Sequence, residues 1–330
     1  MSLSRLLKFG VWMVAFACAG MAQADIFTTA NIGNDGYILR TNNVGETSVF
    51  SSGYYNAQGI AFNSLGTMFV TDGSGGLPEP ENIGGLYTVN SAGVKTVFAT
   101  IDIPFGSGSI AIDPSDNIYV VDATSSILKY GSGGDLISTW SYSDYPTSMV
   151  FYEGNLYVTS ILNNEVGYFD SLGDYHLYKN LPTYLDSEDN VLDFRATGMA
   201  VDGDGNFYVS GGPEENLVIK IVSGAGAISD YVTTGLSGPQ GMQWNGTALV
   251  IADQACGCGP TNTIQLSNGA GGVSLISDLG EDYYPVNLVF APVPERLFLR
   301  WESGRVRWLY YSGNVGKILF VNFVYGPSPE

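Results

Sequence analysis

Short apolar segments recur along the chain at intervals of 39 to 50 residues. In six of them a small or polar residue is followed by three residues that are mostly apolar. These segments lie at 59–62, 109–112, 148–151, 198–201, 241–244 and 287–290. A repeat of this length is typical of the blades of a β-propeller.

Each of the first five segments is followed by a polar turn and then by a second apolar run. The second runs lie at 68–72, 118–122, 156–160, 207–211 and 249–253. The turns are rich in Asp, Asn and Gly, as at 202–206, and these residues favour hairpin connections. Two further strands, such as 85–89 and 95–98, complete a unit of four antiparallel strands, which is the composition of a propeller blade.

The sixth segment, at 287–290, has no convincing second strand after it. The N-terminal region supplies candidates at 26–30, 37–40 and 47–50. We therefore predict an all-β, six-bladed propeller over residues 25–291. In its last blade a C-terminal inner strand pairs with three N-terminal strands, which closes the ring and leaves no open sheet edge.

The unit GxAxDxxGNxYVxD, present at 198–211 and in related form at 109–122, resembles NHL-repeat and gluconolactonase-like six-bladed propellers. The resemblance covers residues 26–291 and implies architecture more than function. Gluconolactonase-like enzymes hold a divalent metal over the channel with carboxylate and amide side chains. Their Glu-Gly-Pro motif is matched here only by Gln58-Gly59-Ile60 and Gln240-Gly241-Met242. Gln lacks the charge of a metal ligand or base, which argues against lactonase activity.

Residues 1–24 have the pattern of a secretory signal. Arg5 and Lys8 precede an apolar stretch at 11–19, and Ala22-Gln23-Ala24 fits the small-residue cleavage rule. The apolar stretch is too short to cross a bilayer. We expect export to the periplasm, the cell surface or the medium, with a mature chain that begins at Asp25.

Residues 290–295 resemble the start of a PEP-CTERM sorting tail, which in that family continues into an apolar membrane span and an Arg cluster. Here Arg296 replaces the second Pro, and residues 296–330 contain no apolar run near the roughly 20 residues of a span. We expect an irregular basic tail at 292–330 with no transmembrane anchor. A frameshift after Glu295 is our hypothesis. It fails if neither alternative reading frame encodes an apolar stretch that ends in Arg. The other interpretation is a natural extension, such as a hairpin on the ring.

The composition changes what the propeller is expected to bind. The chain has 13 Lys and Arg against 32 Asp and Glu, for a net charge of −19. An acidic body repels nucleic acid and anionic lipid, and it favours cations, basic partners or neutral ligands. We expect a monomer that binds a glycan, a peptide or an envelope protein.

Catalytic motifs are lacking. The single histidine, His176, lies in a predicted outer strand, which excludes multi-histidine zinc centres and disfavours a Ser–His–Asp triad. No nucleophile elbow, zinc-protease motif or phosphate loop occurs. We expect a non-catalytic binding or surface scaffold. The alternative is a metal-dependent lactonase, hydrolase or lyase that uses the channel.

Three local features leave metal or redox chemistry open. Residues 202–206 resemble the start of a calcium loop, but Phe207 stands where such a loop needs Gly, so we interpret them as a turn. Asp186, Glu188 and Asp189 are candidates for a Ca²⁺ site, with a solvated loop as the alternative. Cys256 and Cys258 form either a local disulfide, two free thiols or a metal ligand pair.

A ligand of a propeller usually sits where the loops of one rim surround the channel. The predicted rim contains nine polar or charged residues: Gln58, Asp72, Asp122, Thr147, Arg195, Thr197, Gln240, Asp253 and Asn287. The members that begin first strands supply amides and hydroxyls, which can bind a ligand but offer no general acid or base.

Overall fold

The computed structural model describes residues 24–73, 84–103, 109–142, 144–160, 162–185, 188–212, 217–221, 223, 226–254, 262–292, 296–302, 305–311 and 318–322. Every regular element within these ranges is a β-strand. A membrane-spanning helix, one both long enough and apolar enough, is not found in this part of the chain.

Six four-stranded antiparallel sheets form the blades, each ordered from an inner to an outer strand. Blade 1 contains β4 (Ala57–Phe62), β5 (Met68–Asp72), β6 (Gly85–Val89) and β7 (Lys95–Thr100). Blade 2 contains β8 (Ile110–Ile112), β9 (Ile118–Val121), β10 (Ile127–Tyr130) and β11 (Leu136–Trp140). Blade 3 contains β12 (Pro146–Tyr152), β13 (Asn155–Ser160), β14 (Glu165–Phe169) and β15 (Tyr175–Asn180).

Blade 4 contains β18 (Gly198–Val201), β19 (Phe207–Gly211), β20 (Leu217–Ile221) and β21 (Ile228–Val232). Blade 5 contains β22 (Pro239–Trp244), β23 (Leu249–Asp253), β24 (Asn262–Ser267) and β25 (Val273–Gly280). Blade 6 contains β26 (Tyr284–Phe290), β1 (Ile26–Ile32), β2 (Asp35–Thr41) and β3 (Thr47–Tyr54). We use the name start face for the side of the ring at which the inner strands begin.

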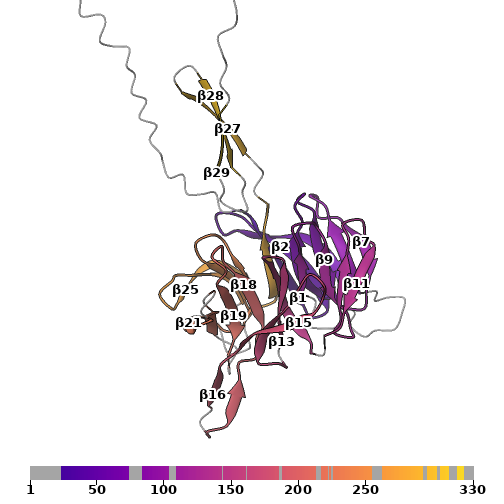
Figure 1. Ribbon diagram of the computed structural model, residues 1–330, viewed down its shortest axis with the longest axis vertical. Helices are drawn as coiled ribbons and strands as arrows, with labels where there is room; N and C mark the ends of the chain where they lie inside the picture. Colours follow the sequence, from indigo (N-terminus) through magenta and orange to yellow (C-terminus); the bar gives the residue numbers. More distant parts are fainter. Residues whose placement is uncertain are drawn as a thin grey trace, which may run out of the picture.

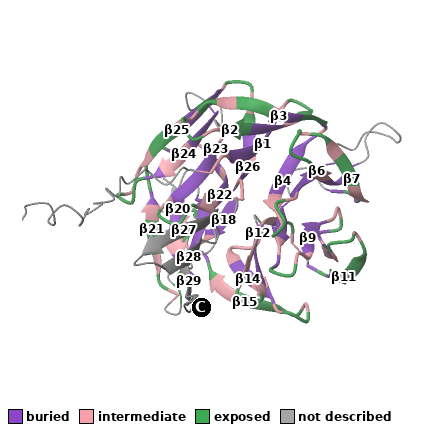
Figure 2. Ribbon diagram, turned by 90° about the horizontal axis from the view of Figure 1, so that it is seen from above, coloured by how far each residue is buried: buried purple, intermediate pink, exposed green. Residues whose placement is uncertain are grey.

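Blade 6 joins the two ends of the propeller, as the sequence predicts. The inner strand β26 pairs antiparallel with β1, with Thr29 opposite Asn287, and the backbone N–H of Ala291 donates to the carbonyl of Asp25 at 2.8 Å. The inner strands of neighbouring blades contact one another around the ring, including β26 with β4. Figure 2 shows the resulting circle of blades. The six-bladed prediction is therefore confirmed.

The apolar core lies between the blades. Six clusters of buried side chains each combine residues of two neighbouring blades, so that every blade packs on both sides. Burial is highest in the second strand of each blade and lowest in the outermost one. All five residues of β5 are buried, the inner strand β12 has two that are, and β7 has none. The second strands are therefore near-continuous apolar runs, as is usual for strands covered on both faces.

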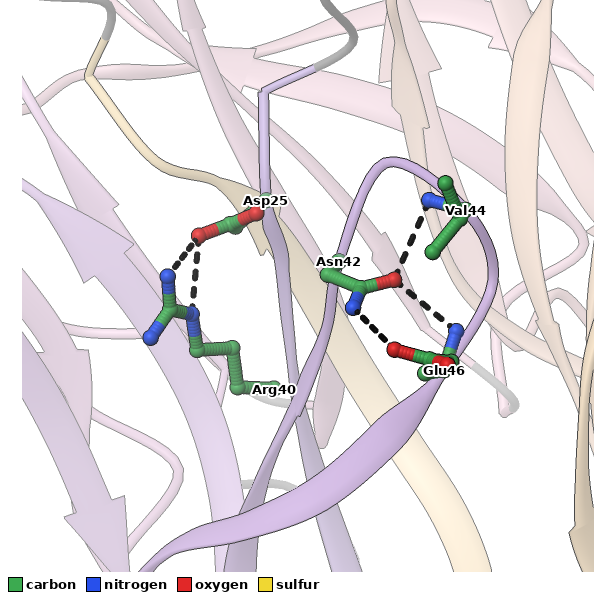
Figure 3. A network of polar contacts seen from close by, with 5 residues as sticks. All are labelled: Asp25, Arg40, Asn42, Val44 and Glu46. Carbon is green, nitrogen blue, oxygen red and sulfur yellow. Dashed lines mark hydrogen bonds and ion pairs between the residues drawn. The ribbon is translucent and has the colours of Figure 1, made fainter.

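One turn type recurs in the hairpins. Its first residue is Asn or Asp, whose side-chain oxygen accepts backbone N–H groups two and four residues later, as Asn42 does from Val44 and Glu46 at 3.0 and 2.9 Å (Figure 3). Its fourth residue adopts positive φ, as at Gly45 (86°), where glycine avoids a Cβ clash. In the same view Arg40 pairs with Asp25, which fixes the first residues of the ring to β2.

Two small sheets lie outside the blades. The hairpin of β16 (Thr183–Leu185) and β17 (Val191–Asp193) connects blades 3 and 4. After the ring, β27 (Arg296–Glu302), β28 (Arg305–Tyr311) and β29 (Ile318–Asn322) form a three-stranded antiparallel sheet (Figure 1). The structure thus has three strands where the sequence predicts an irregular tail. Its runs of Leu, Val and aromatic residues, too short for a membrane span, have the composition that favours strands.

Candidate functional site

A channel runs through the centre of the ring. The six inner strands enclose a cavity of about 300 Å³ there, and it is lined by residues 60–62, 110–112, 148–151, 199–201, 242–244 and 287–289. Ser148, Gln243 and Asn287 are the polar side chains of this lining, and none of the lining residues is titratable. Proton transfer needs a side chain that can gain or lose a proton near the operating pH. The described wall of the channel supplies none.

Hydroxyl groups at the start face connect neighbouring blades. The hydroxyl of Thr147 donates to the carbonyl of Ala196 at 2.9 Å, and that of Thr197 donates to the carbonyl of Pro239 at 2.6 Å. Each acceptor lies at the start of the inner strand of the next blade. Thr147 and Thr197 therefore lie on the predicted rim, and their hydroxyls already hold the ring together.

Asp72 and Asp253 brace the chain where their own blades begin. Asp253 is 1% exposed, and its Oδ1 accepts the backbone N–H groups of Ser237 and Gly238 at 2.9 Å each. Asp72 accepts from the N–H groups of Tyr55 and Asn56 in the same way. Burial raises the pKa of both carboxyl groups, although these hydrogen bonds act in the opposite direction. The two acids are placed to organise loops rather than to face a ligand.

Asp72 also lies beside a partly buried cation. The ammonium of Lys95 is 3.9 Å from its carboxylate, and it sits over the rings of Tyr54 and Tyr87 at 4.4 and 4.7 Å. Burial lowers the pKa of Lys95, and the charge of Asp72 opposes that shift. Tyr54 belongs to blade 6 and the other three residues to blade 1, so the cluster lies between these two blades and pairs the carboxylate with a cation of the chain itself.

The amide and turn residues of the predicted rim also bond within the protein. Asp122 accepts from the backbone of Thr124 and Ser126 in the turn after β9. The Oδ1 of Asn287 accepts from the N–H of Leu288 at 2.8 Å. Like Asp72 and Asp253, these acceptors have partners in the ring itself.

The remaining members of the rim are Gln58, Gln240 and Arg195. Gln58 is 2% exposed, and the Nε2 of Gln240 lies 3.5 Å from the carbonyl of Gly238. Arg195 precedes β18 with a φ of 53°, a left-handed conformation that is uncommon for a residue with a side chain. The predicted residues thus lie near one end of the ring. Gln58, Asp72 and Asp253 are buried there, Arg195 is exposed, and the other five are half-buried, so that a ligand site at this rim stays a prediction.

The metal and cysteine candidates have separate outcomes. Asp202 accepts from the backbone of Asp204 and Asn206 and from the hydroxyl of Tyr208, so residues 202–206 form the predicted turn. Glu188 and Asp189 are exposed, while Asp186, Cys256 and Cys258 lie outside the described residues. Within the described ranges, no three His, Cys, Asp or Glu side chains are grouped so that they could hold a metal ion.

His176 lies on the outer strand β15, as expected. Its Nε2 is 3.3 Å from Asp170, and its ring stacks on Tyr168 with 5.0 Å between centroids. Asp170 belongs to the turn that precedes β15, so the pair sits on the outer side of blade 3. The single imidazole of the chain is therefore remote from the inner strands that line the channel.

A second cavity, which the sequence did not indicate, lies between blades 2 and 3. It measures about 340 Å³ and is lined by Ser141, Tyr142, Asp144, Asn163 and Tyr175; we call it the Tyr142 pocket. The rings of Tyr142 and Tyr175 meet at 48° with 5.3 Å between centroids. Asn163 donates to Asp144 at 2.5 Å. Aromatic walls with a few convergent polar groups are the usual composition of a small-molecule site.

Tyr175 reaches this pocket across a glycine. Its hydroxyl donates to Glu165 at 2.5 Å, and its ring lies so close to Gly167 that a Cβ there would be 2.0 Å from the hydroxyl oxygen. Gly167 therefore makes room for the ring on the surface of β14. These pocket residues come from loops and outer strands and do not repeat from blade to blade, so the periodic pattern carried no signal of them.

Comparison with known proteins supports the fold. No family model and no curated protein matches the chain. A chain of a nidogen–laminin complex superposes with a TM-score of 0.60 at 16% identity, over 81% of this chain and 98% of the other. A streptogramin B lyase superposes with a TM-score of 0.54 at 14% identity, over 88% of this chain and 91% of the other. Virginiamycin B lyase from Staphylococcus aureus superposes with a TM-score of 0.53 at 15% identity, over 82% of this chain and 85% of the other. Identities this low show a shared architecture alone, and on that evidence the chain is a six-bladed β-propeller.

Proposed function

We propose that this protein is an exported, non-catalytic propeller that binds a glycan, a peptide or an envelope protein and serves as a surface scaffold. The superposed structures include lyases and a chain held in a protein complex, so the fold itself supports either class of function. The choice between them rests on the site.

The channel wall carries the proposal. Its described side chains include no acid, base or nucleophilic thiol. The predicted rim has three carboxylates. Asp72 and Asp253 are buried and accept two backbone N–H groups each, and the half-buried Asp122 accepts two in its own turn. A metal-dependent lactonase, hydrolase or lyase would need carboxylates that point into the channel to hold its cation. The observed arrangement instead stiffens the ring, which suits a scaffold.

Export is supported by the pattern of residues 1–24 and by the place of Asp25. Asp25 follows the predicted cleavage site, and within the described residues its ion pair with Arg40 and hydrogen bond with Ala291 tie it to the ring. All strands of the six blades follow Asp25 in the sequence, so cleavage at the predicted site would keep them in the mature chain.

Thermal unfolding in the presence and absence of metal ions tests the non-catalytic assignment. A cation that binds only the folded state raises its stability by RT ln(1 + [L]/Kd), about 2.7 kcal/mol at a hundredfold excess over Kd. We expect the melting temperature to stay within about 1 °C when EDTA, Ca²⁺ or Zn²⁺ is added, with Mg²⁺ at equal ionic strength as the control. A saturable rise of several degrees with Ca²⁺ or Zn²⁺ would support the enzyme alternative instead.

A further inference from the structure

The hydroxyl of Tyr142 is buried without a hydrogen bond among the residues that the structure describes. Tyr142 is 8% exposed and lines the pocket between blades 2 and 3. Tyr175 and Asn163 lie close enough to lower the pKa of Tyr142, but neither meets its hydroxyl at hydrogen-bonding geometry. Burial raises that pKa more strongly, so at neutral pH the group is a protonated donor that requires an acceptor.

An unpaired buried hydroxyl is costly, and such groups are rare in native proteins. When one lies against a cavity that also presents aromatic rings, a carboxylate and an amide, a ligand that completes its hydrogen bond is a direct explanation. The chemistry of the lining then limits what the ligand can be.

The charges near the pocket exclude an anionic ligand. The carboxylate of Asp144 lines it, and that of Glu165 holds the hydroxyl of Tyr175 beside it. Both carboxylates also raise the pKa of Tyr142, which places their negative charge next to its hydroxyl. A phosphate, sulfate or uronate would meet repulsion from both.

A cationic ligand could pair with the carboxylates, but it would not accept a hydrogen bond from the hydroxyl of Tyr142. An ammonium group only donates hydrogen bonds, so the hydroxyl proton of Tyr142 would remain without an acceptor. A sugar hydroxyl donates and accepts at once. It can accept from Tyr142 while it donates to a carboxylate, and a neighbouring hydroxyl can accept from an amide such as that of Asn163.

The aromatic ring of Tyr175 supplies the apolar part of such a site. The residue is 36% exposed and its ring stands at 48° to that of Tyr142. The face of an aromatic ring carries partial negative charge and attracts the weakly positive C–H groups of a pyranose. An extended peptide would need a longer groove or a free strand edge for its backbone, whereas this cavity is compact at about 340 Å³.

We propose that the Tyr142 pocket binds one neutral sugar unit of a glycan, with Tyr142 and Asn163 donating hydrogen bonds, Asp144 accepting them and the ring of Tyr175 stacking on the sugar. This inference rests on the binding function proposed above and locates it away from the channel rim. It commits to a neutral glycan, so that a peptide or protein ligand is an alternative outcome of the test.

The full-length mature protein is applied to a printed array of neutral and uronate-containing oligosaccharides, and the neutral oligosaccharide with the strongest signal is then titrated by calorimetry. We expect binding to neutral members and not to their uronate counterparts. Tyr142→Phe removes one hydrogen bond and should weaken binding about tenfold, since 1.4 kcal/mol corresponds to a factor of ten. Tyr175→Ala should weaken it by at least as much.

Matched measurements keep the result interpretable. Tyr168→Phe on the same strand as Gly167 alters a hydroxyl outside the pocket and should leave affinity unchanged. Tyr142→Phe removes the unpaired donor, so its melting temperature should equal or exceed that of the wild type. If both Tyr142→Phe and Tyr175→Ala still bind neutral glycans with unchanged affinity, the Tyr142 pocket is not the binding site, but the proposed binding function is retained. Binding to a peptide or protein alone overturns the sugar assignment, again without removing the binding function. Turnover of a substrate in the channel would instead overturn the proposed function.

Discussion

Substitution of Asp253 separates a role in bracing the ring from a role in binding. Its Oδ1 accepts the N–H groups of Ser237 and Gly238, and Oδ2 lies 3.2 Å from the Nε2 of Gln265. Asp253→Ala removes the acceptor of these two N–H groups, that of Gly238 buried and that of Ser237 half-buried, at roughly 1–3 kcal/mol each. Asp253→Asn keeps an amide oxygen at the position of Oδ1, and Gln265 can rotate its amide to meet the new N–H₂ group.

We therefore expect Asp253→Ala to lower the free energy of unfolding by about 2–6 kcal/mol at pH 7. At about 2–4 °C per kcal/mol for a domain near this size, the melting temperature should fall by about 4–24 °C. Asp253→Asn should stay within about 1 kcal/mol of the wild type, because the acceptor remains and the burial of a charge is relieved.

The pH dependence gives the sign of the charge effect. Burial raises the pKa of folded Asp253 above its unfolded value of 3.8, so the folded state binds the proton more tightly. The carboxyl group therefore destabilises the fold as pH rises from about 3.8 through the raised pKa, and the penalty is complete above it. Because Asn does not titrate, the stability of Asp253→Asn relative to wild type should increase between pH 4 and pH 7.

Urea denaturation followed by circular dichroism at pH 4, 5.5 and 7 measures these differences for the three proteins. Binding to the oligosaccharide selected on the array serves as the functional control, and Asp253→Asn should leave it unchanged. If Asp253→Asn is as unstable as Asp253→Ala at pH 7, or if its relative stability falls with rising pH, the bracing role of the carboxylate is refuted. If Asp253→Asn loses binding while it keeps full stability, Asp253 belongs to the ligand site.

Two further predictions concern the ring and its export. A Cβ at Gly198 would lie 1.8 Å from the carbonyl oxygen of Gln240, whereas nothing lies within 4 Å of one at Gly203. In chemical denaturation Gly198→Ala should lose about 3 kcal/mol while Gly203→Ala loses less than about 1 kcal/mol. Equal losses would show that the inner strands do not approach this closely. The secreted protein should begin at Asp25 by N-terminal sequencing, and a product that retains residues 1–24 would contradict the predicted cleavage.

The fold was predictable because its signals are local and repeated. The same sequence pattern recurs in each blade. The segment at 287–290 had no second strand after it, and β1–β3 had no inner strand before them, so the two could be assigned to one blade. The structure also explains the glycine that opens several repeats. A Cβ at Gly241 would lie 2.5 Å from the Cα of Asn287 on the next inner strand, so only glycine permits that approach.

The candidate site was less accessible to sequence reasoning. Thr197 and Asp253 look like ligand-binding residues because they are polar and lie near the channel. Their actual partners are backbone groups of Pro239, Ser237 and Gly238, which a one-dimensional pattern does not identify. The Tyr142 pocket was missed for a related reason. It arises where unrelated loops of two blades meet, and one of its rings is admitted by the absence of a side chain at Gly167.

The shared last blade also constrains how the molecule can fold. Thr29 bonds to Asn287 across a sequence separation of 258 residues, so this contact has a very high contact order. Loop-closure entropy must be overcome before such long-range pairing contributes, which slows folding. Blades 1 to 5 can assemble in order as the chain lengthens, but the circle cannot be completed until almost all of it has emerged. If the chain is exported as proposed, its ring can close only after the last inner strand has also crossed the membrane.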